Sequence, residues 1–183
     1  MKGIVFTEFI EMVEDRFTPA VADRIIGRAQ LANGGAYTAV GTYEHAELVR
    51  LVQELARETG LGAGALVRGF GEHLAGRFAE HFPQFFAACP TLFDFLASVD
   101  GTIHVEVRKL YPDAELPAFD VESMDAGRMA MVYRSARRFE DLAEGLIVGS
   151  ARHYRDAVDV RREAVTLPAG GAATRFVITR RKA

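Results

Sequence analysis

The chain has 183 residues, of which 49% are hydrophobic, and a formal net charge of −3 with a pI near 6.0. This length and apolar content suffice for one domain with a full hydrophobic core, so a disordered chain is excluded. The weak negative charge gives no general attraction to nucleic acid, and one cysteine, Cys89, can form neither an internal disulfide nor a thiolate metal cluster.

The N-terminal segment, residues 2 to 17, has apolar residues at helical spacing in two adjoining stripes. This pattern predicts a helix that is buried on more than one side. Glu8 and Glu11 interrupt the apolar run long before it reaches the length of a signal-peptide core or a membrane span. We therefore expect a soluble, cytoplasmic protein with no membrane partner.

Helical patterns continue through the next part of the chain. Thr18 is placed to cap a helix that begins at Pro19, and the segment from Asn33 to Gly35 is expected to end it. Three further helical patterns cover residues 44–60 with Gly60 as the stop signal, residues 62–83, and residues 84–100 with a break near Pro90.

The last third of the chain changes to strand patterns. Residues 119–138 predict two strands joined at Asp125 to Gly127, and residues 156–181 predict two more joined at Pro168 to Gly171. A helical pattern over residues 139–157 separates these hairpins. We predict a single domain of α+β fold, with a helical lobe over roughly residues 1–60 and a lobe over roughly residues 61–183 that holds an antiparallel four-stranded sheet and packed helices.

His104 lies in a segment whose local pattern is ambiguous. Its β-branched neighbours favour a strand, in which they would point inward and His104 outward. The alternative is a helix with Asp100 as its N-cap. On a helix, His104 and Glu106 would face away from each other, so a hydrolytic zinc site is not indicated.

Three polar residues stand at every second position at the end of the first predicted hairpin. If the segment is extended, Tyr133, Ser135 and Arg137 lie on one face. A purely structural alternative has Ser135 capping the next helix, Arg137 on the surface and Tyr133 ending the core strand. The functional alternative is that the hydroxyls and the planar guanidinium converge on the carboxylates of an amphiphilic ligand.

These features together resemble a known family. A Tyr-x-Ser-x-Arg element about thirty residues after His104, in a chain that begins MKGIVF and continues through LAEGLIVGSARHY, is similar to the H-NOX (haem-nitric oxide/oxygen binding) domains of the stand-alone bacterial type, which are related to the haem domain of soluble guanylate cyclase. The resemblance spans essentially the whole chain. It implies a haem b between the two lobes, held non-covalently because the sequence has no CxxCH motif.

The resemblance also implies roles for individual residues. His104 would be the proximal ligand of a five-coordinate ferrous iron, on a helix. Tyr133, Ser135 and Arg137 would hold the haem propionates, and Pro117 matches the proline that presses on the porphyrin. The opposite, distal face would be lined by Val5, Phe9, Leu74, Phe78, Leu142 and Leu146.

The implied activity is gas sensing without catalysis. Oxygen on ferrous iron gains negative charge and profits from a hydrogen-bond donor, whereas nitric oxide binds strongly without one. Relatives that hold oxygen stably have a tyrosine five residues after the triad arginine, where this chain has Leu142, and Leu74 occupies a second polar position of that network.

We therefore predict a nitric oxide sensor that also binds CO and excludes O2. It would signal through weakening of the iron–His104 bond and a conformational shift. Because no cyclase, kinase or methyl-accepting segment follows in the sequence, we expect the output to pass to a separate protein, such as a histidine kinase or an enzyme of cyclic-di-GMP turnover. The alternative is a haem-free small-molecule-binding or adaptor module of similar fold.

Overall fold

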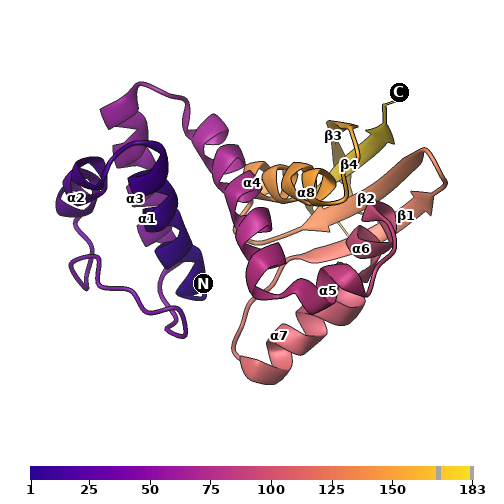
Figure 1. Ribbon diagram of the computed structural model, residues 1–183, viewed down its shortest axis with the longest axis horizontal. Coiled ribbons are helices and arrows are strands. Elements are labelled where there is room, and N and C mark those ends of the chain that lie inside the picture. The colour runs from indigo at the N-terminus through magenta and orange to yellow at the C-terminus, as the bar shows by residue number, and fades with distance from the viewer. Residues whose placement is uncertain (168–169, 182–183) are drawn as a thin grey trace.

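The computed structural model describes residues 1–167 and 170–181 and has the predicted α+β fold. Helices α1 (Ile4–Arg16), α2 (Pro19–Arg28) and α3 (His45–Thr59) form a helical lobe on one side of α4 (Ala63–His81), and the sheet lies on the other side (Figure 1). The short helices α5 (Pro83–Ala87), α6 (Leu92–Ser98) and α7 (His104–Leu110) follow, and α8 (Glu140–His153) covers one face of the sheet (Figure 1).

Local capping fixes some of the predicted helix ends. Thr18 Oγ1 accepts a hydrogen bond from the Val21 N–H at 3.2 Å, so α2 begins as predicted. Gly60 ends α3 in the left-handed conformation, with φ of 72°. The predicted end of α2 near Asn33 was wrong, because the helix stops at Arg28 and the Ala29 carbonyl accepts a tertiary hydrogen bond from Arg50 Nε at 3.0 Å instead of continuing the helical ladder.

The predicted four-stranded antiparallel sheet is confirmed, with strand order β1-β2-β4-β3. Its strands are β1 (Ala118–Met124), β2 (Arg128–Arg134), β3 (Val158–Thr166) and β4 (Ala172–Arg180). The first hairpin turns where predicted, because Asp125 Oδ1 accepts hydrogen bonds from the N–H groups of Gly127 and Arg128 at 2.7 and 2.8 Å. Pro168 and Ala169 of the second predicted turn lie outside the described residues.

Two apolar clusters form the core, and α4 contributes to both. The first joins α1, α2, α3 and one side of α4, and the second joins the inner face of the sheet to α6 and α8. Leu74 belongs to the first cluster, whereas Phe78 packs against both. Among the described helices, none is long and apolar enough to cross a membrane.

Candidate functional site

His104 is the first residue of α7, and the backbone before it is not an ordinary helix. Residues Val99–Ile103 form one π-helical turn, in which the His104 N–H donates to the Val99 carbonyl. Such a turn inserts an extra residue into the helical ladder and is frequent at functional sites. His104 is only 9% exposed and Val105 is 38% exposed. The strand alternative was therefore wrong, both in the backbone conformation and in placing His104 outward and Val105 inward.

His104 lies on a helix, but Asp100 is not the N-cap residue that the helical alternative expected. Asp100 instead orients the His104 ring. Asp100 Oδ1 lies 2.9 Å from His104 Nδ1. Burial lowers the pKa of His104, and the hydrogen bond to Asp100 partly opposes this shift. A carboxylate on Nδ1 fixes the tautomer and makes Nε2 the more basic nitrogen, so Nε2 is the atom that can bind a metal. Sequence reasoning missed this pair, although Asp100 stands one helical turn before His104.

A second residue that sequence reasoning missed connects His104 to the sheet. The Phe119 ring on β1 lies 6.0 Å from the His104 ring and 5.3 Å from the Tyr133 ring on β2, measured between centroids. Pro117, which is half-buried, directly precedes β1. Because the start of β1 pairs with the end of β2 through Ala118 and Arg134, the structure gathers the histidine, the proline and the tyrosine at one end of the β1–β2 hairpin.

Tyr133, Ser135 and Arg137 lie close together, but not through strand alternation. β2 ends at Arg134, and the chain turns over the next residues, so the predicted shared face was wrong. Ser135 Oγ accepts a hydrogen bond from the Arg137 N–H, and Tyr133 Oη accepts one from the Phe139 N–H, both at 3.2 Å. Burial raises the pKa of Tyr133, while the hydrogen bonds with Ser135 and Phe139 lower it. Ser135 therefore shapes the turn and does not cap α8, whose N-cap residue is Phe139.

The Arg137 side chain is 16% exposed and is only partly paired. Its Nη1 donates to the Glu115 carbonyl oxygen at 2.7 Å, and its Nη2 donates to the Glu115 carboxylate. Nε of Arg137 is buried and has no hydrogen-bond partner in the part of the chain that the structure describes. A buried donor without an acceptor costs about 1–3 kcal/mol, so this N–H is a candidate for binding an anionic ligand.

The six residues expected on the distal face come together in the first apolar cluster. They lie on α1, α4 and α8, as expected. Phe9 and Leu74 are buried, at 0% and 2% exposure, whereas Val5, Phe78, Leu142 and Leu146 are half-buried against the same cluster. The three helices therefore bring the six residues into one apolar region.

Glycines allow α4 and α8, which carry four of these six residues, to pack very closely. A Cβ atom at Gly145 would lie 2.1 Å from the Arg68 carbonyl oxygen and 2.8 Å from Gly71 Cα. A Cβ atom at Gly149 would lie 2.6 Å from Ala75 Cβ. Any larger side chain at these positions would move α8, and with it Leu142 and Leu146, relative to α4.

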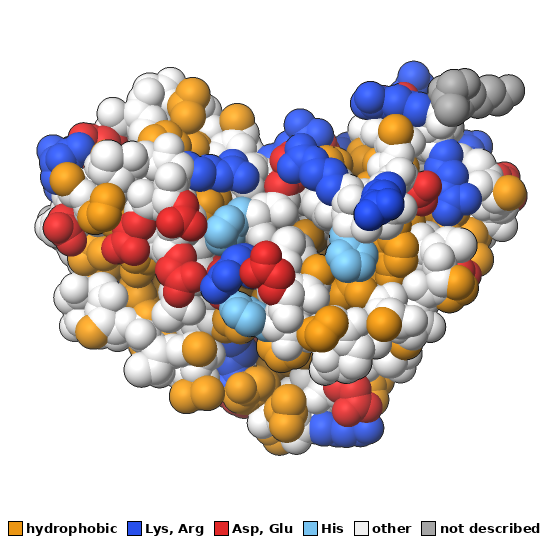
Figure 2. Space-filling model, in the orientation of Figure 1, with side chains coloured by type: hydrophobic (Ala, Val, Ile, Leu, Met, Phe, Trp, Pro, Cys, Tyr) orange, Lys and Arg blue, Asp and Glu red, His pale blue; other side chains and the backbone are white. Residues whose placement is uncertain are grey.

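His73, the neighbour of Leu74, belongs to a separate polar cluster. His73 Nε2 lies 3.6 Å from Glu8 Oε2, and Arg77 Nε donates to the same oxygen at 2.8 Å. Glu8 is 4% exposed, a buried carboxylate that the apolar pattern of α1 did not reveal. On the face of the molecule that Figure 2 shows, histidine side chains lie among charged side chains near the middle. The His73 ring thus lies on the Glu8 side of α4, about 100° around the helix from Leu74, and its Nε2 is buried without a hydrogen-bond partner among the described residues.

The donor set fits a haem. An imidazole with one nitrogen held by a carboxylate is a suitable iron ligand. The buried Arg137 Nε and the hydroxyls of Tyr133 and Ser135 suit a pair of carboxylates. Within residues 1–167 and 170–181, no three His, Cys, Asp or Glu side chains are grouped so that they could hold a bare metal ion.

Comparison with known proteins identifies the family. A sequence profile for the family described as Haem-NO-binding matches residues 2–162. The H-NOX protein from K. algicida in its unliganded Fe(II) state is 34% identical over 100% of this chain and 98% of that chain, with a TM-score of 0.90. An H-NOX protein from S. oneidensis in the Fe(II)NO state (24% identity, TM-score 0.89) and an H-NOX domain from Shewanella oneidensis in the Fe(II)CO state (23%, 0.87) each match over 100% of both chains. No curated protein sequence gives a significant match.

The fold is that of a haem-based gas-sensor domain. More specifically, the chain belongs to the haem-NO-binding (H-NOX) family, which confirms the resemblance drawn from the sequence. Homologues in this family bind haem and sense diatomic gases.

Proposed function

We propose that this protein is a single sensor domain, with a helical lobe over about residues 1–60 and a haem-ligating lobe over about residues 61–183, that binds nitric oxide at a haem b between them and excludes O2. The observation that carries the proposal is the buried His104 ring, whose Nδ1 is held by Asp100 at 2.9 Å and whose Nε2 is left as the metal-binding atom. The role is one of binding and signalling, not catalysis.

The haem-binding roles follow from the donors just described. Haem iron, when bound, supplies the position at which a diatomic gas coordinates. His104 Nε2 would bind the iron, and Asp100 would keep the imidazole in the tautomer that does so. Tyr133, Ser135 and Arg137 would hold the propionates by hydrogen bonds, without a covalent link to the chain. Pro117, at the same end of the β1–β2 hairpin, would contact the porphyrin.

The choice of gas would rest on the apolar character of the distal residues. Leu142 and Leu74 have no hydrogen-bond donor in their side chains, and the His73 ring lies about 100° around α4 from Leu74, with Nε2 3.6 Å from Glu8 Oε2. A bound oxygen needs such a donor, whereas nitric oxide does not, and CO also binds ferrous haem without one. These contacts support a site that binds NO and CO and disfavours O2.

Signalling would start at α7. When gas binds on the distal side, His104 would loosen its bond to the iron, and α7 would be free to shift. The loop after α7 touches the helical lobe, because Lys2 Nζ lies 3.5 Å from Asp113 and 4.3 Å from the centre of the Tyr111 ring, and Thr42 Oγ1 donates to Asp113 at 3.3 Å. A shift of α7 would therefore reach the helical lobe and change a surface that a separate partner protein reads, such as a histidine kinase or a cyclic-di-GMP enzyme.

The test is the visible absorption spectrum of the purified protein, oxidised, reduced, reduced in air and reduced with NO. We expect a Soret band that changes on addition of NO or CO and is unaffected by air-saturated buffer on the time scale of mixing. A rapid spectral change in air that reverses on removal of oxygen would overturn the gas assignment. A protein that stays colourless after addition of haem would overturn the haem assignment and favour the haem-free binding module.

A further inference from the structure

The guanidinium of Arg137 is held by a residue outside the Tyr-x-Ser-x-Arg motif. Glu115 contributes two acceptors, its carbonyl oxygen at 2.7 Å from Nη1 and its carboxylate to Nη2. These two contacts fix both the position and the plane of the guanidinium, because an arginine fork with two occupied donors cannot rotate freely. The third nitrogen of the guanidinium, Nε, is buried and has no partner among the described residues.

Glu115 belongs to the loop between α7 and β1, the segment that directly follows the helix of His104. Its side chain is 80% exposed, so it is not part of the core and its pairing with Arg137 is not forced by packing. Asp113, two residues earlier in the loop, is bound instead by Lys2 and Thr42 of the N-terminal region. The two acidic residues of the loop therefore bind different partners: Asp113 binds Lys2 and Thr42, and Glu115 binds Arg137.

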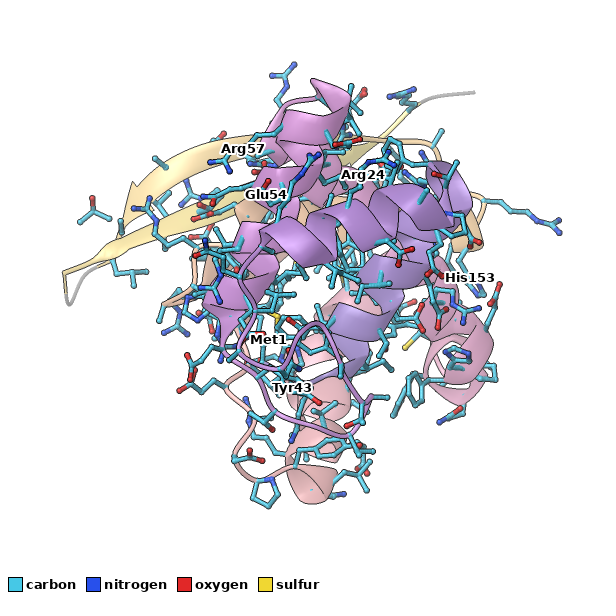
Figure 3. All side chains as sticks on the ribbon, turned by 90° about the vertical axis from the view of Figure 1, so that its left-hand side faces the viewer. Met1, Arg24, Tyr43, Glu54, Arg57 and His153 are labelled. Atoms are coloured by element: carbon cyan, nitrogen blue, oxygen red, sulfur yellow. The ribbon has the colours of Figure 1, made fainter. Side chains whose placement is uncertain are left out.

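The N-terminus lies in the same neighbourhood. The Met1 ammonium group donates to the Tyr43 carbonyl at 2.7 Å, and Figure 3 shows these two residues side by side in the helical lobe. Burial lowers the pKa of this ammonium group, Arg137 lowers it further, and Glu115 raises it. Glu115 thus lies within electrostatic reach of both the Met1 ammonium group and the Arg137 guanidinium.

On the basis of the proposed function, we infer that Glu115 is a positioning residue for the haem: it aims the Nε donor of Arg137 at the propionates and offsets the charge of the guanidinium. The orientation of the Nε–H bond follows from the two contacts that fix Nη1 and Nη2. The charge effect follows from the ion pair, because a paired guanidinium presents less positive potential to a neighbouring site than an unpaired one.

This role predicts effects of opposite sign at the two partners. A positive charge beside a haem favours the reduced iron, which carries one electron more. Glu115→Gln keeps the size of the side chain and removes its charge, so it should raise the Fe(III)/Fe(II) midpoint potential. Arg137→Gln should lower the potential, and the double variant should lie between the two single variants.

The experiment is spectroelectrochemical titration of the haem-loaded full chain, together with the rate of haem transfer to excess apomyoglobin. Glu115→Gln should speed haem loss on the order of tenfold, the lower end of the effect of removing an outer partner of a bound cofactor. Glu115→Asp, which keeps the charge, should stay closer to the unmodified protein in potential than Glu115→Gln does. Asp113→Asn is the matched control, because it removes an equal charge from the same loop without touching Arg137, and its shift should be less than half as large.

The results separate this inference from the function on which it rests. If the unmodified protein binds haem and NO but Glu115→Gln leaves both potential and haem loss unchanged, the positioning role is wrong and the function stands. Slower haem loss in Glu115→Gln would also overturn the role, since it would mean that Glu115 competes with the propionates for Arg137. Equal shifts of the midpoint potential in Glu115→Gln and Asp113→Asn would show that any negative charge in the loop has this effect. That result would contradict a specific role for the pairing of Glu115 with Arg137. If the unmodified protein binds no haem, the proposed function itself fails.

Discussion

Replacing Gly145 with alanine should destabilise the protein by forcing α8 away from α4. The added Cβ would lie 2.1 Å from the Arg68 carbonyl oxygen and 2.8 Å from Gly71 Cα, and ordinary contacts begin near 3.4 Å. The helices must therefore separate by about 1 Å, and overpacking of this kind costs about 1–3 kcal/mol. Because both obstacles are backbone atoms that cannot rotate aside, we take the upper part of this range.

The helix propensity of alanine offsets part of this cost. Alanine is favoured over glycine by about 1 kcal/mol in a helix interior, so the expected net loss is about 2 kcal/mol in the free energy of unfolding. For a chain of this size, that corresponds to a fall in Tm of about 4–8 °C. Leu142 and Leu146 move with α8, so the same variant should alter the rate of CO rebinding.

The assay is urea unfolding followed by circular dichroism, at equal haem content in all samples. Gly76→Ala is the matched control, because Gly76 lies on α4, is exposed, and has nothing within 4 Å of its added Cβ. It should stabilise the protein by about 0.5–1 kcal/mol. If Gly145→Ala is as stable as the unmodified protein while Gly76→Ala behaves as expected, the close packing of α4 and α8 is not real.

Three further outcomes are expected. His104→Ala should purify without haem and recover a Soret band when imidazole is added, and unchanged haem content would show that another residue binds the iron. Leu142→Tyr places a phenol donor on the distal side of α8, so the reduced variant should change its spectrum in air where the unmodified protein does not; identical spectra would remove Leu142 from the choice of gas. Burial lowers the pKa of His73, so the folded state prefers the neutral ring. The stability that this group contributes is therefore present above its unfolded pKa of 6.5 and is lost as the pH falls below that value. The urea midpoint should therefore fall less between about pH 7.5 and 5.5 in His73→Gln than in the unmodified protein, and equal slopes would assign the pH dependence to other groups.

The sequence by itself determined the features that depend on short-range physics. Thr18 and Gly60 set helix ends through a side-chain acceptor and a left-handed backbone, and Asp125 set the first hairpin turn through its own neighbours. Each of these signals involves contacts within three or four residues, so they are visible in the order of the amino acids. The joint spacing of His104 and the Tyr-x-Ser-x-Arg motif was specific enough to predict the family.

Only the tertiary structure decided how the candidate site is held together. The π turn before His104 overrode a β-branched local pattern that favours a strand, and the turn after Arg134 brought Ser135 and Arg137 together without alternation. The pairing of Arg137 with Glu115 spans 22 positions, and that of Glu8 with Arg77 spans 69. Residues so far apart have no signature in local periodicity, because their contact depends on how whole helices and loops pack. The partners that aim the functional side chains are therefore readable only once the chain is folded.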